Sequence, residues 1–124
     1  MKLTFVETRV FTDRWHSRHN DESLRLLQND LLDNPDLGKA IPGCSILRKL
    51  RWGDESRNKG KRGGVRVIYV HTPEAGRIDL ITVYGKDERD GLTKEQVKQL
   101  CGLARLLREE AKRSARSSRR NRTT

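Results

Sequence analysis

Residues 47–52 read Leu-Arg-Lys-Leu-Arg-Trp, and residues 59–70 read Lys-Gly-Lys-Arg-Gly-Gly-Val-Arg-Val-Ile-Tyr-Val. Both stretches contain strand-like runs, and a polar, glycine-rich loop separates the runs. Arg and Lys recur inside the strands as well as in the loop. Charged side chains within a strand are costly unless they face water, a counter-charge or a ligand. The pattern predicts two neighbouring strands whose cationic surface suits a phosphate-bearing substrate.

The net charge of +10 is concentrated in two segments of the 124-residue chain. Residues 47–66 carry eight basic and two acidic side chains, and residues 112–124 carry six basic and no acidic ones. This clustering favours nucleic acid as the partner class. The chain has no apolar segment long enough to span a membrane, and its N-terminus lacks a secretory hydrophobic region. We therefore expect a cytoplasmic protein without a membrane partner.

The N-terminal third of the chain predicts a strand, a helix and a loop. Apolar and polar residues alternate over Phe5–Phe11, which indicates a first strand, and the polar residues after it are expected to be irregular. A helix capped by Asn20 or Asp21 should run to about Asn34. Asp36–Gly43 is expected to be a loop. The apolar face of the helix is formed by leucines at helical spacing, namely Leu24, Leu27 and Leu31, widened by Leu26 and Leu32.

Three further runs predict an antiparallel meander, with strands over Ser45–Trp52, Val65–Thr72 and Arg77–Tyr84. The last helix begins with a capping box, in which the side chains of Thr93 and Gln96 each accept a hydrogen bond from the backbone amide of the other residue. Its apolar stripe ends at Ala111.

The predicted order is β-α-β-β-β-α. It indicates a small α+β fold with an antiparallel sheet of about four strands and helices packed on one face. Residues 1–111 are expected to form one domain. Residues 112–124 form a basic, Ser-rich tail that is expected to be disordered.

The two cysteines, Cys44 and Cys101, have neither metal-site spacing nor the pattern of a disulfide framework. In a chain without a signal peptide they are expected to be reduced and structural. We expect no metal and no cofactor.

Strand parity indicates where the basic side chains gather. Lys49 and Arg51 share a parity on one strand, and Tyr84 and Lys86 share one at the end of another. In a twisted meander these residues and Arg66 can converge on one concave surface. Cleavage of RNA by internal attack needs a base for the 2′-hydroxyl, cations for the phosphorane and an acid for the leaving 5′-oxygen, and it needs no metal.

Three motifs carry a resemblance to a known family: residues 47–51 (LRKLR), 61–69 (KRGGVRVIY) and 80–88 (LITVYGKDE). With the opening 5–8 (FVET) and the stretch 31–43, they resemble toxins of the RelE/ParE superfamily, most closely its HigB-type branch. The resemblance covers about residues 4–108, in the same order and with similar spacing.

The resemblance implies the toxin of a type II toxin–antitoxin system, which enters the ribosomal A site and cleaves mRNA without a metal. It also implies a cognate antitoxin, typically of helix-turn-helix type. The catalytic positions carried over are Lys49, Arg51, Arg66, Tyr84 and Lys86, with Arg66 as the best candidate for transition-state stabilisation. Arg48, Lys59, Lys61 and Arg62 are carried over as RNA-binding residues.

Two departures from the family pattern affect the proton transfers. Some relatives have two lysines where this chain has Lys49 and Arg51, and an arginine is a poor general base because it stays protonated. The C-terminal tyrosine of some relatives is absent, since no aromatic residue follows Tyr84.

Other interpretations stay open from the sequence. The protein could be a non-catalytic toxin acting on another target such as gyrase, or an RNA-binding protein that does not cleave. His16 and His19 could form an acid–base pair, but their position outside the motifs favours surface residues. Trp15 and Trp52 are expected to pack in the core or at its rim rather than stack on bases.

Overall fold

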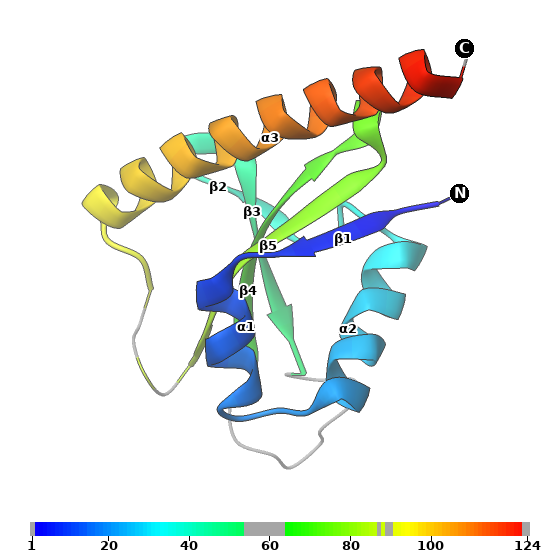
Figure 1. Cartoon of the computed structure of the whole chain (residues 1–124). Coiled ribbons are helices and arrows are strands. Elements are labelled where there is room, and N and C mark those ends of the chain that lie inside the picture. Colours follow the sequence, from blue (N-terminus) through cyan, green and yellow to red (C-terminus); the bar gives the residue numbers. More distant parts are fainter. Residues whose placement is uncertain (1, 54–63, 87, 89–90, 123–124) are drawn as a thin grey trace.

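The computed structural model describes residues 2–53, 64–86, 88 and 91–122 (Figure 1). The described chain forms one five-stranded sheet and three α-helices. In chain order the elements are β1 (Thr4–Glu7), α1 (Arg9–His16), α2 (Asp21–Asp33), β2 (Lys39–Ile41), β3 (Cys44–Trp52), β4 (Val65–Thr72), the 3₁₀ turn η1 (Pro73–Ala75), β5 (Arg77–Gly85) and α3 (Lys94–Arg122). No helix in this part of the chain is long and apolar enough to cross a membrane.

The sheet has the strand order β1-β5-β4-β3-β2. The strands β2 to β5 pair antiparallel, whereas β1 lies parallel to β5 at the edge. The predicted α+β class is confirmed, with five strands where about four were expected. The additional strand is β2, which falls in the stretch predicted to be a loop. It has only three residues and its register shifts between Ala40 and Ile41, so no alternation marks it in the sequence.

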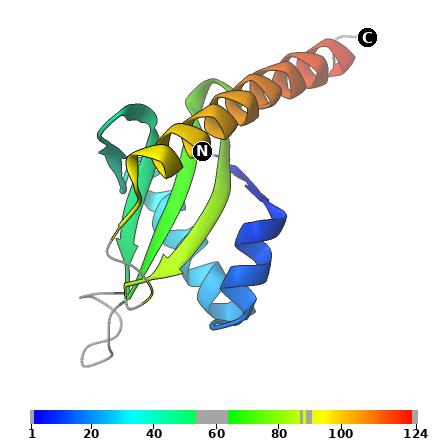
Figure 2. The same ribbon diagram turned by 90° about the vertical axis from the view of Figure 1, so that its left-hand side faces the viewer.

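Helices cover both faces of the sheet (Figure 2). On one face, α1 and α2 bury Trp15, Leu27 and Leu31 against strand residues such as Tyr69. On the opposite face, α3 packs Cys101 and Ala104 against a separate set of strand residues that includes Leu47, Ile68 and Val70. The helix layer that the sequence indicated is thus divided, with α2 on one side and α3 on the other.

The first strand is shorter than predicted, because α1 begins where the alternation was expected to continue. Thr8 caps this helix by accepting a hydrogen bond from the Phe11 amide (3.0 Å), and its hydroxyl donates to the Ile81 carbonyl of β5 (2.6 Å). Phe11 and Trp15, four residues apart, point into the core. The expectation of a strand to Phe11 followed by irregular chain was therefore wrong. A short helix with a mostly polar outer face has little periodicity to distinguish it from a strand.

The helix α2 agrees closely with its prediction. Asn20 is the N-cap, its side chain accepts from the Ser23 amide (2.9 Å), and the helix ends before Asn34. Leu24, Leu27 and Leu31 are buried as expected. Leu26 and Leu32 do not widen the buried face, since they are 37% and 42% exposed.

The helix α3 starts as predicted and ends later. Thr93 and Gln96 form the expected capping box, with distances of 2.9 Å and 3.1 Å. Instead of ending near Ala111, the helix continues to Arg122, so the disorder expected from residue 112 onward was wrong over the described residues. Ala111 remains buried and Ala115 half-buried, which continues the packed side of the helix beyond the predicted end.

The cysteines are not reduced. Cys44, at the start of β3, and Cys101, on α3, form a disulfide with a Cα–Cα distance of 5.8 Å. The 57 residues that separate them in sequence conceal this proximity, which arises because α3 crosses β3 on the sheet. The expectation of two free thiols is therefore corrected.

A buried phenol holds the segment between α2 and β2 against the sheet. The Tyr69 hydroxyl accepts from the Gly38 amide (2.8 Å) and donates to the Pro35 carbonyl (2.9 Å). Gly38 is needed there, because a Cβ atom would lie 2.9 Å from the Tyr69 ring and 3.1 Å from the Lys49 backbone. The contact fixes the approach of β2 to β3.

We expect Tyr69→Phe to lower the free energy of unfolding by about 1–3 kcal/mol, because it leaves a buried amide and a carbonyl without their partner. Urea denaturation would measure the loss. Thr72→Val is the matched control: the Thr72 hydroxyl is buried and has no hydrogen-bond partner among the described residues, so its removal should cost almost nothing. Equal effects of the two substitutions would contradict the anchoring role of Tyr69.

Candidate functional site

Three predicted site residues form a row across the sheet. Arg51 of β3 lies directly opposite Arg66 of β4, and Arg66 lies directly opposite Tyr84 of β5. Residues opposed in this way project from the same face with Cβ atoms about 4.5–5.5 Å apart. The face is the one that α3 covers elsewhere, since Tyr84 packs in the same cluster as Cys101. Arg51, Arg66 and Tyr84 therefore share one face of the sheet, as strand parity predicted for these three residues.

A second row lies one step along the same face. Lys49 of β3 is opposite Lys39 of β2 on one side and opposite Ile68 of β4 on the other. Lys39 was not among the predicted site residues, because the sequence indicated a loop around it. With β2 in place, Lys39 extends the basic surface to the sheet edge.

The two rows combine buried and exposed cations. Arg66 is 9% exposed and Tyr84 is 5% exposed, whereas Lys49 is half-buried and Arg51 and Lys39 are exposed. Like charges directly opposite each other destabilise a sheet, and both the Arg51–Arg66 and the Lys39–Lys49 pairs are of this kind. A bound anion would relieve that repulsion.

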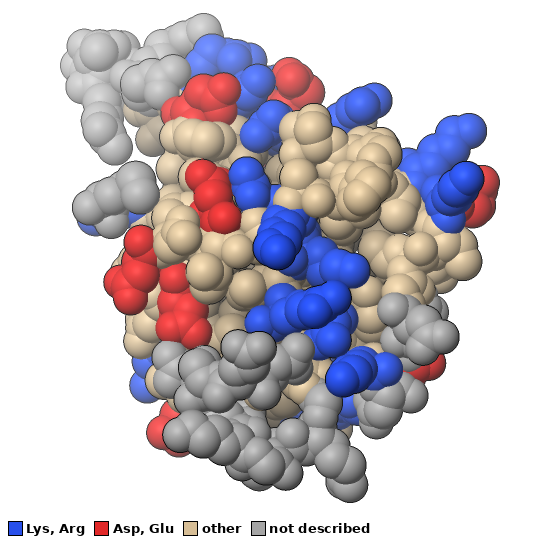
Figure 3. Space-filling view, turned by 180° about the vertical axis from the view of Figure 1, so that it is seen from behind, with Lys and Arg blue, Asp and Glu red and all other residues tan. Residues whose placement is uncertain are grey.

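The surface view agrees with this arrangement. Seen from behind, on the side where β2 and β3 lie, Lys and Arg side chains form a band through the middle of the molecule (Figure 3). Acidic side chains flank the band on one side.

Lys86 lies beyond the last residue of β5. Its side chain is exposed, and its amide donates to the Gly64 carbonyl (3.3 Å), which ties it to the start of β4 next to Arg66. The turn that carries Lys86 is closed by Glu88, whose amide donates to the Gly85 carbonyl (3.0 Å). The Glu88 carboxylate accepts in return from the Gly85 amide (3.0 Å).

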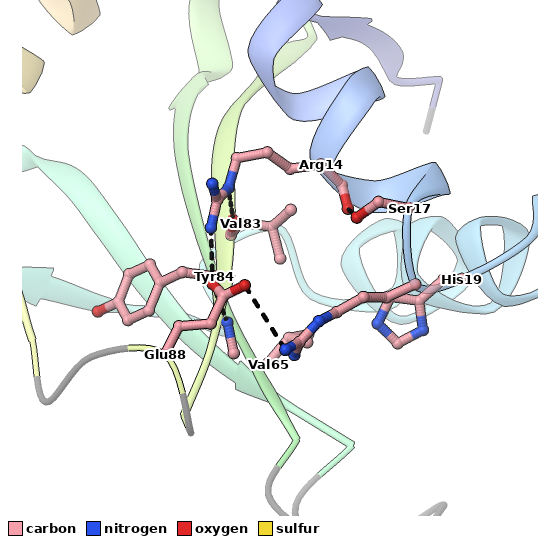
Figure 4. Close-up of a pocket in the computed structure, with 9 residues that line it drawn as sticks. Arg14, Ser17, His19, Val65, Val83, Tyr84 and Glu88 are labelled. Carbon is pink, nitrogen blue, oxygen red and sulfur yellow. Dashed lines mark hydrogen bonds and ion pairs between the residues drawn. The ribbon is translucent and has the colours of Figure 1, made fainter.

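Two arginines from the N-terminal helix region hold Glu88 (Figure 4). Arg14 donates to its carboxylate at 2.6 Å and to the Val83 carbonyl at 2.5 Å, and Arg18 lies 3.5 Å from the second carboxylate oxygen. Arg14 and Glu88 were not singled out in the sequence, because their contact joins segments 74 residues apart. They position the Lys86 turn rather than line the basic rows.

The predicted RNA-binding residues are not gathered with these rows. Arg48 lies on the opposite face of β3, where it donates to the Gly38 carbonyl (2.6 Å) and lies 3.5 Å from Asp36. It therefore supports the segment before β2. The predictions for Lys59, Lys61 and Arg62 fall outside the described residues.

The two tryptophans pack in the core, as expected, and only one of the two nearby histidines is a surface residue. His16 is exposed and contacts Asp21 (2.8 Å), which raises the pKa of its imidazole. His19 is half-buried against Trp15, with ring centroids 4.5 Å apart, and it lines a small cavity of about 50 Å³. Burial lowers its pKa, with a smaller contribution from Arg18. Tyr84 lines the same cavity, and Figure 4 shows its ring pointing away from His19.

His19 makes the fold sensitive to acid. Because its pKa is lower in the folded state, the stability it contributes is present above the ordinary value near 6.5 and is lost as the pH falls below it. We expect the urea midpoint of the wild-type protein to drop more between about pH 7.5 and pH 5 than that of His19→Gln. Both proteins retain His16, so its opposite contribution cancels in the comparison. Parallel pH profiles would show that His19 is not responsible.

The arrangement suits a phosphodiester. Arg51 and Arg66 are opposed on neighbouring strands with Tyr84 next in the row and Lys49 in the adjacent row, and planar guanidinium groups bind phosphate oxygens in bidentate fashion.

The solved structures that share this fold include two toxin-system structures, although no protein-family model matches the chain. One is a double mutant of the E. coli toxin RelE in the free state, with a TM-score of 0.55 and 17% identity. The match covers 80% of this chain and 98% of that one. The other belongs to the intact E. coli RelBE toxin–antitoxin complex, with a TM-score of 0.50 and 20% identity, covering 70% of this chain and 99% of that one. By its fold, this chain is RelE-like.

Proposed function

We propose that the protein is the toxin of a type II toxin–antitoxin system and inhibits translation by cleaving mRNA on the ribosome. The observation that carries the proposal is the Arg51–Arg66–Tyr84 row, with Lys49 and Lys39 beside it, on a RelE-like fold. Assignment to the HigB-type branch rests on the motifs over residues 47–51, 61–69 and 80–88.

The proposed reaction is attack of a ribose 2′-hydroxyl on the adjacent phosphorus. Arg66, the most buried cation of the row, would hold the non-bridging oxygens as negative charge builds up on them. Arg51 would bind the same phosphate from the neighbouring strand. These fixed charges supply the electrostatic stabilisation, so the chemistry can proceed without a metal.

Proton transfer requires a base for the 2′-hydroxyl and an acid for the leaving 5′-oxygen. Lys49, Lys86 and Tyr84 are the groups at the site that can exchange a proton. Tyr84 can alternatively act as a platform on which a base stacks.

A cognate antitoxin is proposed as the protein partner. The likeness to a chain of the RelBE toxin–antitoxin complex supports it, and the HigB-type motifs suggest an antitoxin of helix-turn-helix type.

The decisive experiment is inducible expression of the intact chain, with mapping of new 5′ ends on translated and untranslated copies of one transcript. We expect new ends on the translated copy alone, and growth arrest. Arg66→Ala should abolish the new ends, and Arg9→Ala is its matched control, because Arg9 is an exposed arginine of α1, which packs on the opposite face of the sheet. Growth arrest with intact mRNA would overturn the nuclease assignment and favour a non-catalytic toxin.

A further inference from the structure

The helix α3 carries a narrow stripe of basic side chains along nearly its whole length. Lys94, Lys98, Arg105, Lys112 and Arg116 are spaced so that, at about 100° per residue, they fall within an arc of about 40°. The stripe extends over about 33 Å, since an α-helix rises about 1.5 Å per residue. The portion from Lys112 onward was expected to be a disordered tail and instead continues the helix over the described residues.

The stripe faces solvent. Lys94, Lys98, Arg105 and Arg116 are exposed and Lys112 is half-buried, whereas the sheet-facing side of the helix is formed by small apolar residues such as Ala104 and Ala111. In the described part of the chain, no carboxylate lies within ion-pairing distance of these five cations. Figure 3 shows Lys and Arg side chains along the upper part of the molecule, where α3 runs.

The acidic residues of α3 neutralise the stripe only in part, and the nearest of them is Glu109, which follows Arg105 by four residues. Glu110 lies on another side of the helix and binds Arg77 of β5 at 2.9 Å. Glu95 and Glu109 are exposed, and no acidic residue follows Glu110 in the sequence. The positive potential therefore increases toward the C-terminal half of the helix.

A helix face that contacts only solvent is expected to have a different arrangement of charges. Exposed helices are stabilised by opposite charges four residues apart, as in Arg105–Glu109, but this stripe also has like charges at that spacing in Lys94–Lys98 and Lys112–Arg116. Lys94 also lies in the first turn, where the helix dipole disfavours cations. Both features are unfavourable for the isolated chain, and an anionic partner laid along the stripe would compensate for them.

We propose that the α3 stripe binds the sugar-phosphate backbone of RNA, as a contact surface separate from the Arg51–Arg66–Tyr84 row. A straight row of cations about 33 Å long fits a regularly spaced chain of phosphates, and it includes no aromatic or amide side chain that would read bases. The stripe would therefore add affinity without sequence preference and hold RNA on the protein while the site acts. The choice of RNA as the polyanion rests on the proposed function.

The test measures RNA affinity apart from cleavage. All proteins carry Arg66→Ala so that they cannot consume the probe, and binding is titrated over a range of salt concentrations. The probes are a mixed-sequence RNA duplex, a single-stranded RNA and purified ribosomes. The stripe variant is Lys98→Gln, Arg105→Gln, Arg116→Gln. The matched control removes three exposed cations elsewhere, with Lys2→Gln, Arg9→Gln, Arg25→Gln.

We expect the stripe variant to bind the duplex roughly a hundredfold more weakly near 0.15 M salt, with a salt slope shallower by about 2 to 3. Weaker binding of the stripe variant to ribosomes and to the duplex would identify structured RNA as the target. Weaker binding mainly to the single-stranded RNA would identify mRNA. An unchanged slope, or an equal loss in the control, would overturn the proposal. If mRNA stayed intact in cells but the stripe variant still bound RNA more weakly than the control, the nuclease assignment would be wrong and the proposed RNA contact on α3 would be supported.

Discussion

Arg66→Ala is expected to lower the rate of mRNA cleavage by roughly 100- to 1,000-fold and to abolish growth arrest. Arg66 is the central residue of the row, with Arg51 and Tyr84 opposite it on either side. Arg66 as a whole is only 9% exposed, and a fixed charge stabilises a transition state most strongly where water is excluded. Removing one such group typically costs two to three orders of magnitude in rate, about 2.7–4 kcal/mol.

A second variant and a test of folding make the effect of Arg66→Ala interpretable. Arg66→Lys keeps the charge and loses the planar bidentate geometry, so we expect it to recover only part of the rate. Circular dichroism and a urea midpoint should establish that both variants fold, because the stem of Arg66 is buried between neighbouring strands. If Arg66→Ala cleaved mRNA at the wild-type rate in a folded protein, the site assignment would be wrong.

Reduction of the Cys44–Cys101 disulfide is expected to lower the free energy of unfolding by about 4 kcal/mol. The bond closes a loop with a sequence separation of 57 residues, and the chain-entropy model assigns a stabilisation of that size to a loop of this length. It also joins the start of β3 to α3 at a point where both cysteines are less than 8% exposed. Urea denaturation with and without reductant would measure the difference.

The double variant Cys44→Ala, Cys101→Ala serves as the control, since reductant should leave its midpoint unchanged. We expect the reduced wild-type protein to approach the stability of this variant. Two reactive thiols in the unreduced, denatured wild-type protein would contradict the presence of the bond. Because the disulfide connects α3 to the sheet, its loss should weaken the docking of that helix before it affects the face covered by α1 and α2.

The parts of the fold that were predictable are those with strong local periodicity or capping chemistry. The strand Val65–Thr72 agrees with its prediction residue for residue, and the caps at Asn20 and Thr93 have the expected partners. Parity alone was enough to put Lys49 and Arg51 on one face, because a strand without a bulge has a strict period of two.

The parts that were missed depend on contacts between distant segments. The strand β2 exists because three residues pair with β3, and the hydrogen bonds of Tyr69 hold the segment before it. Lys39 can be recognised as a site residue only when its pairing with Lys49 is known. The disulfide and the Arg14–Glu88 pair likewise join residues far apart in sequence, and no spacing rule predicts such partners.

The order of strands also governs when the molecule can be assembled. The first strand of the chain, β1, has its partner in the last one: Thr4 pairs with Arg77, and the Thr8 hydroxyl donates to the Ile81 carbonyl. During synthesis the N-terminal segment must therefore wait until about two thirds of the chain has emerged before it can join the sheet. A truncated product that ends before β5 lacks Tyr84, and it also lacks the strand with which β1 pairs. A ribosome that stalled before reaching β5 would thus release a fragment that cannot form the site.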